Sequence, residues 1–244
     1  MSQQLKGKVA VITGGGTGIG QGVAATLAEA GAQVVIIGRR ADKLEETIRA
    51  IDAQPTPVYR ALDVADQVAV AATFAEITET YGAIHILVNN AGVNVLKRRV
   101  SELSPEDWNY LMDVNATGAF NTIHAVLPQM RERKDGVIIN VSSIAGVRPS
   151  VLGGAAYSAS KHAMTALTFV LALEEKDNGI RATNLCPGEV NTPILDARPI
   201  KVSEEHKEQI LQPSDVAAAV LFISTLHPRA HIPEMLIKPT TQAF

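Results

Sequence analysis

Short apolar segments alternate with longer amphipathic segments along almost the whole length of this chain. Each short segment is apolar throughout, which indicates a strand of a parallel sheet that is buried on both faces. Regular alternation of such strands with helices predicts an α/β protein in which helices cover the sheet. The predicted strands are residues 8–13, 33–38, 58–62, 84–89, 137–142, 180–186 and 235–237.

The predicted helices fit between these strands. They lie at residues 18–30, 42–52, 67–80, 157–176 and 215–225, and a further helix begins at Ser104. The pattern indicates a doubly wound, Rossmann-type parallel sheet of about seven strands with helices on both faces. No linker, internal repeat or low-complexity segment interrupts the chain, so residues 1–244 are expected to form a single domain.

The composition excludes several classes of protein. The formal net charge is −3 with no long run of one sign, which argues against a nucleic-acid or anionic-membrane partner. Cys186 is the one cysteine, so no internal disulfide can form and a reduced, cytoplasmic setting is expected. The N-terminus lacks the apolar core of a signal peptide, and no apolar run approaches the roughly 20 residues that span a bilayer.

Two predicted helical segments carry apolar or small residues on most of their faces, namely residues 116–127 and 163–173. A helix that is apolar all round needs burial all round. One side can cover the sheet, and the other is expected to meet another subunit of a homo-oligomer. The alternative is that alanine and threonine simply face solvent there.

A glycine-rich turn lies between the first predicted strand and the first predicted helix. Gly14, Gly16, Thr17, Gly18 and Gly20 belong to it, together with Ile19. Glycines permit a tight turn and a close backbone approach to a pyrophosphate, which the free N–H groups of the helix N-terminus can bind. The alternative is a glycine-rich turn needed only for packing. No Lys-Ser/Thr pair follows, which excludes a triphosphate-binding loop.

Arg39 and Arg40 follow the second predicted strand. In doubly wound dinucleotide-binding proteins an acid at this point holds the ribose hydroxyls of NAD, whereas an arginine accommodates the additional phosphate of NADP. A planar, permanently charged guanidinium suits phosphate. The absence of an acid predicts a preference for NADP(H), chiefly through Arg39, with NAD(H) as the second candidate. The alternative is two solvated arginines at the start of a surface helix.

Tyr157 and Lys161 are spaced i, i+4, so a helix places them on one face. A tyrosine with a pKa of about 10 is a poor base at neutral pH, and a neighbouring ammonium favours its phenolate form. Ser142 and Ser143 end the fifth predicted strand, at the sheet edge where ligands bind. Ser143 is the better candidate for a hydroxyl that holds a carbonyl oxygen, and the other serine is expected to serve a turn.

Over nearly its full length the chain resembles the short-chain dehydrogenase/reductase family. The matching segments occur in the order and spacing of that family. They are the glycine-rich turn from Thr13, Asp63-Val64, Asn89-Asn90-Ala91-Gly92, Asn115, Ser143, Tyr157-x-x-x-Lys161 and the segment from Pro187 to Thr192.

The resemblance implies four catalytic residues. Tyr157 resembles the acid/base of the family, and Ser143 resembles the serine that orients the substrate. Lys161 resembles the lysine that binds the nicotinamide ribose and lowers the tyrosine pKa. Asn115 resembles the asparagine that kinks its helix and holds a water linking the lysine to solvent.

The resemblance also implies cofactor contacts beyond the glycine-rich turn. Asp63 and Val64 resemble the adenine-binding pair, and Asn90, Ala91 and Gly92 resemble the segment that flanks the cofactor. The last group resembles the residues placed by the Pro187-Gly188 turn, with Thr192 at the nicotinamide carboxamide. This group comprises Pro187, Gly188, Val190 and Thr192.

The sequence thus predicts a dinucleotide-binding and catalytic domain that transfers a hydride between NADP(H) and a small carbonyl or alcohol substrate. One alternative is an NADP(H)-binding regulatory protein without turnover. Another is an enzyme that uses its cofactor internally, such as an epimerase. The segment after Thr192 is short, which favours an open pocket or a small substrate. His227 and His231 lack metal-ligand spacing, so no metal is expected.

Overall fold

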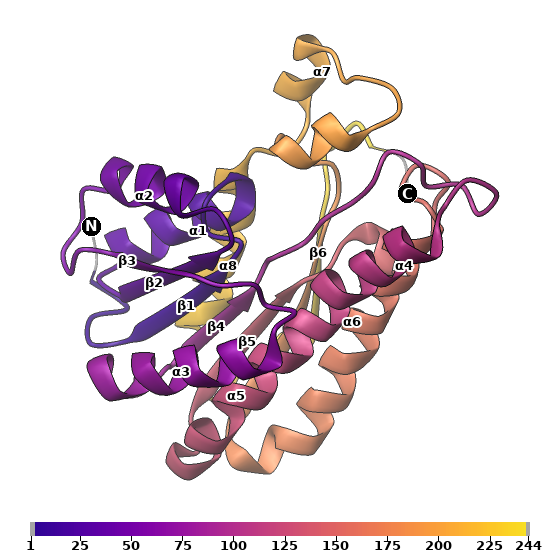
Figure 1. Ribbon diagram of the computed structural model, residues 1–244. Coiled ribbons are helices and arrows are strands. Elements are labelled where there is room, and N and C mark those ends of the chain that lie inside the picture. The colour runs from indigo at the N-terminus through magenta and orange to yellow at the C-terminus, as the bar shows by residue number, and fades with distance from the viewer. Residues whose placement is uncertain (1–2, 243–244) are drawn as a thin grey trace.

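The computed structural model describes residues 3–242, which include one seven-stranded parallel sheet in the order β3-β2-β1-β4-β5-β6-β7 (Figure 1). The order reverses between β1 and β4, and in open α/β sheets ligands bind beyond the carboxyl ends of the strands at such a point. The doubly wound sheet predicted from the sequence is confirmed. The strands are β1 (Val9–Thr13), β2 (Gln33–Gly38), β3 (Val58–Ala61), β4 (Ile86–Asn89), β5 (Gly136–Val141), β6 (Ile180–Pro187) and β7 (Glu234–Ile237).

Helices cover both faces of the sheet (Figure 1). They are α1 (Gly18–Glu29), α2 (Ala41–Ala50), α3 (Gln67–Tyr81), α4 (Pro105–Met112), α5 (Gly118–Arg133), α6 (Ala155–Glu175), α7 (Glu204–Gln209) and α8 (Pro213–Thr225). The α6 helix begins two residues before the predicted start, because Gly154, with a φ of 84°, provides the non-helical turn that precedes it. None of the helices within residues 3–242 is long and apolar enough to cross a membrane.

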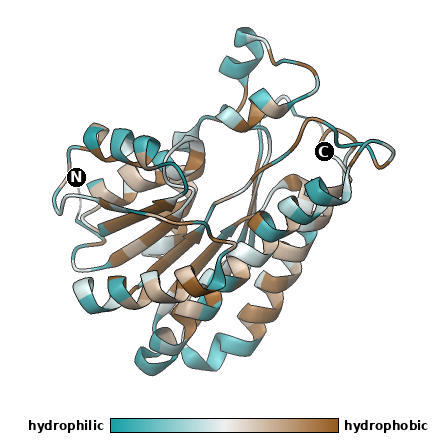
Figure 2. Cartoon of the chain, viewed as in Figure 1, coloured by the Kyte–Doolittle hydropathy of each residue, from teal (hydrophilic) through white to brown (hydrophobic). Residues whose placement is uncertain are grey.

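Successive residues of each central strand enter two different hydrophobic cores. In β1, Ala10 and Ile12 pack with α1 and α8, whereas Val11 packs with α3 and α5 on the other face. This explains the continuously apolar strand sequences, since both faces of every central strand are buried. In Figure 2 the central strands are accordingly hydrophobic, and the polar residues gather on the helices and loops around them.

His85, which precedes β4, has a structural role. Its Nδ1 accepts a hydrogen bond from the backbone N–H of Val9 at 3.1 Å, so it fixes the start of β1 against β4. Burial lowers the pKa of His85, which favours the neutral imidazole that this bond requires. The site described below lies at the opposite, carboxyl ends of these strands.

Candidate active site

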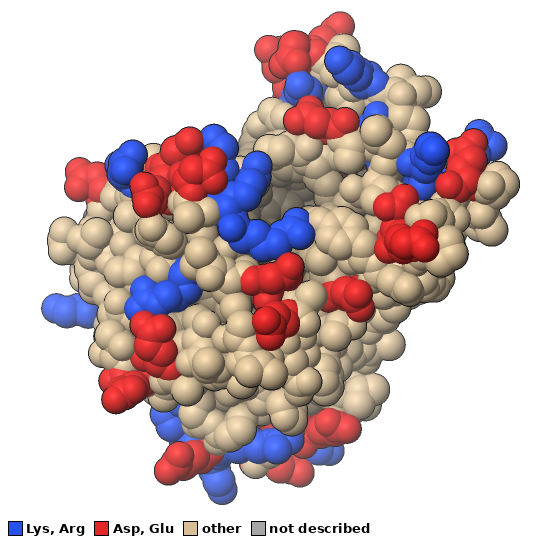
Figure 3. Space-filling view, viewed as in Figure 1, with Lys and Arg blue, Asp and Glu red and all other residues tan. Residues whose placement is uncertain are grey.

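A cavity of about 680 Å³ lies at the carboxyl ends of the strands. Figure 3 shows it as the central hollow of this face, with Lys and Arg side chains gathered along one side of its rim. Its volume is within the range of roughly 300–1,000 Å³ typical of ligand and cofactor sites. Almost all of the candidate residues named from the sequence line this cavity; Gly20 and Asn115 are the two that do not.

The glycine-rich turn is shaped by close backbone packing. Gly14 and Gly18 have positive φ angles of 68° and 56°, where L side chains are strained. A Cβ added to Gly20 would collide with the carbonyl oxygen of Gly14, so Gly20 serves the turn itself without facing the cavity. Asn90 holds the turn from β4, because its Nδ2 donates to the carbonyl oxygens of Thr13 and Gly14 at 3.0 and 3.2 Å.

Arg39 is held in place at the rim of the cavity. Its Nη2 donates to the hydroxyl of Tyr110 at 2.8 Å, and its guanidinium lies 5.6 Å from the centre of the Tyr110 ring. Its Nη1 also lies 4.0 Å from the Oδ2 of Asp63. Arg40 and Lys43 extend the same cationic rim. Sequence analysis missed Lys43, although its place in the first turn of α2, directly after the arginine pair, was a usable signal.

Tyr157, Lys161 and Ser143 lie together in the cavity wall. The Ser143 hydroxyl lies close enough to Tyr157 to lower its pKa, and the Lys161 ammonium lies 5.7 Å from the centre of the Tyr157 ring. Ser142 has a different role, because its buried hydroxyl bonds to the carbonyl oxygen of Lys161 at 3.1 Å and so ties the strand end to α6. The three candidate side chains can therefore act on one ligand.

The electrostatics differ from the sequence-based picture. Burial raises the pKa of Tyr157, and the two influences that lower it are the Ser143 hydrogen bond and the positive charge of Arg98. The Lys161 ammonium instead donates to the carbonyl oxygen of Val141 at 2.8 Å. Burial lowers the pKa of Lys161 to about 8. Arg98, which sequence analysis missed, is therefore an electrostatic neighbour of the tyrosine.

Asn115 lies in a π-helical turn (Asp113–Thr117) between α4 and α5. Its side chain is fully buried and exchanges hydrogen bonds with the backbone of Val93, at 2.8 and 3.0 Å, and donates to Ser160 at 3.0 Å. A Cβ added to Gly92 would lie 3.5 Å from the Lys161 ammonium and 3.6 Å from the Asn115 amide oxygen. The ammonium and the amide oxygen therefore both lie next to Gly92. The local widening of the helix brings the asparagine there.

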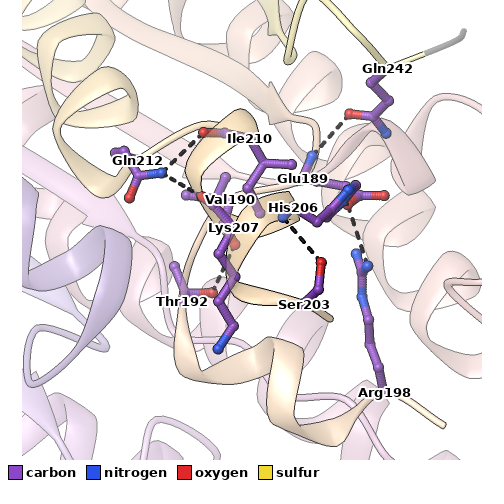
Figure 4. Close-up of polar contacts among 10 residues, drawn as sticks. All are labelled: Glu189, Val190, Thr192, Arg198, Ser203, His206, Lys207, Ile210, Gln212 and Gln242. Carbon is purple, nitrogen blue, oxygen red and sulfur yellow. Dashed lines mark hydrogen bonds and ion pairs between the residues drawn. The ribbon is translucent and has the colours of Figure 1, made fainter. Parts of the chain in front are cut away.

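The segment after Thr192 forms a short lid over the cavity. It contains a 3₁₀ turn (Pro193–Ala197) and α7, which stands clear of the sheet in Figure 1. Figure 4 shows how it is anchored: Glu189 accepts hydrogen bonds from Arg198 at 3.3 Å and, when the Nε2 is protonated, from His206 at 2.7 Å. Gln242 joins from the C-terminal side, where its Oε1 accepts from the Glu189 N–H. No sequence motif marked these contacts.

Two other candidates have no part in the site. Burial raises the pKa of the Cys186 thiol to about 12, which makes it unreactive as a nucleophile. Between residues 3 and 242, no group of three or more His, Cys, Asp or Glu side chains is arranged to hold a metal ion.

The buried lysine makes a testable contribution to stability. Between pH 8 and 10.5 the folded protein binds fewer protons than the unfolded chain, so the free energy of unfolding rises as the pH increases. The gap between the two pKa values corresponds to about 3 kcal/mol. The free energy of unfolding is measured with urea from about pH 7 to about pH 10.5 for the wild type and for Lys161→Met. The wild-type value minus the Lys161→Met value should rise by this amount over that range. A pH-independent difference would contradict the buried ammonium.

Comparison with known proteins agrees with this geometry. The family model described as short chain dehydrogenase matches residues 8–202. An uncharacterized oxidoreductase of Staphylococcus aureus strain N315 is 34% identical over 235 residues, which cover 96% of this chain and 98% of that protein.

Solved structures extend the likeness. A metagenomic short-chain oxidoreductase in complex with NADP is 32% identical with a TM-score of 0.84, covering 98% of this chain and all of that one. An alcohol dehydrogenase from Thermococcus sibiricus complexed with 5-hydroxy-NADP is 30% identical with a TM-score of 0.86, covering 97% and 98%. The chain belongs to the short-chain dehydrogenase family and is an NAD(P)-dependent oxidoreductase.

Proposed function

We propose that this protein reduces a small carbonyl compound with NADPH, or oxidises the corresponding alcohol with NADP⁺, and that Tyr157 is its acid/base. The observation that carries the proposal is that Ser143, Tyr157 and Lys161 line one cavity, with the Lys161 ammonium 5.7 Å from the centre of the Tyr157 ring. A small-molecule substrate with a reacting C–O group fits this arrangement, because two hydroxyls can hold one oxygen. Reduction is the direction expected of an NADP(H) enzyme in a cell.

The residues at the site fit a nicotinamide dinucleotide. A helix N-terminus with glycines at positive φ angles suits a pyrophosphate, and the cationic rim suits the additional phosphate of NADP. Asp63 and Val64 would lie at the adenine, and Asn90, Ala91 and Gly92 beside the ribose and nicotinamide. The segment from Pro187 to Thr192 would hold the nicotinamide end. When bound, the cofactor supplies or accepts the hydride.

The chain's own residues then manage the proton. Ser143 and Tyr157 hold the substrate oxygen, and Tyr157 donates its proton to that oxygen during reduction or removes one during oxidation. Burial raises the Tyr157 pKa, which favours the neutral phenol that reduction requires. The Lys161 ammonium and the buried Asn115 side chain converge behind it, which suits the binding of a ribose hydroxyl or a water that relays the proton.

The preference for NADP(H) over NAD(H) is part of this proposal. Arginines and no acid directly follow β2, and Arg39 is oriented by Tyr110 and Asp63. Two of the similar structures are described with NADP or a derivative of it bound. We also propose a cytoplasmic location for the single-domain enzyme, which the one buried cysteine supports.

Absorbance of NADPH, followed with a panel of ketones, aldehydes, keto acids and keto esters, tests the proposed reaction. Oxidation of NADPH with one class of compound is the expected result. NADPH binding without turnover of any compound would contradict the proposal and favour the regulatory alternative. Binding is measured separately through the fluorescence of NADPH, so that loss of cofactor affinity cannot be mistaken for loss of chemistry.

We further propose a homotetramer built through an apolar face on α5 and α6. This face consists of Phe120, Phe169, Val170 and Leu173, which are between 37% and 70% exposed in the single chain. In Figure 2 hydrophobic residues continue along α6. Burial of such a face against a second copy removes apolar surface from water.

Replacing Leu173 with Glu should dissociate the assembly, because the carboxylate would be buried without a partner. Sedimentation velocity should find a tetramer for the wild type and a smaller species for the variant. Val68→Glu is the matched control: Val68 is 80% exposed, against 70% for Leu173, but lies on α3, outside the apolar face. A wild-type monomer, or an unchanged assembly in Leu173→Glu, would refute this interface.

A further inference from the structure

The part of the cavity near Tyr157 has more positive charge than the cofactor needs. Six lysine and arginine side chains line the cavity, against two acids, Asp63 and Glu189. Three of the cations form the rim at the end of β2, where the phosphates of the cofactor would bind. The other three are Arg98, Lys161 and Arg198, and they lie on the side of Tyr157 and the lid.

Arg98 is a buried guanidinium without a carboxylate partner. Its side chain donates to the carbonyl oxygens of Val95, Leu152 and Ala197, which leaves two of its five N–H donors unused. The residue is 7% exposed and lines the cavity. Within residues 3–242 no acid forms an ion pair with it, and the one group that favours its charged form is Tyr157 itself. A charge buried in this way requires a counter-ion.

Arg198 is the second cation at this point. Its side chain is 15% exposed and pairs with Glu189, whose carboxylate is shared with His206 (Figure 4). Arg198 lies close enough to Arg98 for its charge to lower the pKa of Arg98. Of these two neighbouring guanidiniums, Arg198 pairs with a carboxylate that it shares with His206, and Arg98 pairs with none within residues 3–242; both line the cavity.

We propose that the substrate is anionic: a keto or hydroxy compound whose carboxylate or phosphate group binds Arg98 and Arg198 while its reacting C–O group meets Tyr157 and Ser143. This inference rests on the proposed reductase function and names its substrate class. Guanidiniums bind carboxylate and phosphate through paired N–H donors, so the unused donors of Arg98 match such a group. An anion here would also compensate the charge that the lid and the loop before α6 enclose.

Arg98 also ties together three segments, namely the loop after β4, the loop before α6 and the 3₁₀ turn of the lid. A variant of Arg98 can therefore lose activity through the loops alone. Arg198 is the better residue to test, because its side chain pairs with Glu189 and does not tie three backbone segments together as Arg98 does. Lys201→Gln is the matched control, since Lys201 is an exposed cation of the same segment that does not line the cavity.

Paired substrates test the proposal. Pyruvate, acetoacetate and levulinate are each compared with their methyl esters, and dihydroxyacetone phosphate with dihydroxyacetone, by initial rates of NADPH oxidation. The expected result is a kcat/KM about 10- to 100-fold higher for the anion in at least one pair. Arg198→Gln should lower kcat/KM for the anion about tenfold or more relative to its neutral partner, so that the preference shrinks, and Lys201→Gln should keep the preference. The pair that responds identifies carboxylate or phosphate as the group recognised.

Equal or faster turnover of every neutral partner would overturn the anionic substrate and leave the reductase function standing. If no compound is turned over, the reductase function fails, and binding decides the inference independently. Calorimetric titration of malonate into the NADP⁺-saturated protein should show binding that Arg198→Gln weakens about tenfold or more. Absence of malonate binding, or equal binding to both proteins, would overturn the anion site.

Discussion

Replacing Tyr157 with Phe is expected to lower kcat by about 10²- to 10⁴-fold, the usual contribution of a positioned acid/base, and to leave NADPH binding unchanged. The ring would still fill its place beside Lys161, so the change removes the proton without opening a cavity. Initial rates on a substrate found in the panel, together with NADPH fluorescence titration, measure the two effects separately. No change this large is expected from any other single hydroxyl of the cavity.

Tyr81→Phe is the matched control, because it deletes the same hydroxyl at the end of α3, outside the cavity. It should leave both kcat and NADPH affinity at the wild-type values. Turnover retained in Tyr157→Phe would contradict the assignment of the acid/base. Lost NADPH binding in that variant would mean that the tyrosine hydroxyl serves the cofactor instead of the proton.

Replacing Arg39 with Gln is expected to weaken NADPH binding about 10- to 100-fold and to leave NADH binding nearly unchanged. A charge-assisted hydrogen bond to phosphate contributes about 1.5–3 kcal/mol, and only NADPH carries the additional phosphate. The Tyr110 hydroxyl orients Arg39, so little further ordering of its side chain is needed on binding. Fluorescence titration with both cofactors gives the two dissociation constants.

Arg49→Gln serves as the control for this change. Arg49 is an arginine of α2 that pairs with Glu45 on the solvent side, away from the cavity. Its replacement should alter neither dissociation constant. If the wild type binds NADH more tightly than NADPH, or if Arg39→Gln weakens both cofactors equally, the assignment of the additional phosphate to Arg39 is wrong.

The sheet could be predicted from the sequence because its signal is local and repeated. Strands such as β2 (Gln33–Gly38) are apolar at every central position, since one set of residues enters each of the two cores. The start of α6 was harder to place. Its N-cap is Gly154, which has no side chain to cap the helix and so gives a weak signal for the boundary.

The parts of the site that sequence analysis missed depend on contacts between distant segments. Arg98 lies in a loop without a sequence motif. One of the carbonyl oxygens that its side chain contacts belongs to Ala197, which is distant in the sequence. The direction of the Lys161 ammonium likewise depends on the end of β5, where the carbonyl oxygen of Val141 receives it. Residue spacing predicts that Tyr157 and Lys161 share a helix face, but it carries no information about which third group either side chain meets.

The most direct test of hydride transfer uses NADPH in which both hydrogens at C4 of the nicotinamide are replaced by deuterium. The protein is incubated with this cofactor and the panel of carbonyl compounds, and the products are analysed by mass spectrometry. The account predicts an alcohol product with one deuterium on the former carbonyl carbon, formed in step with NADPH oxidation and absent with Tyr157→Phe. Bound NADPH with no labelled product from any compound would contradict it, as would product formed without net oxidation of the cofactor.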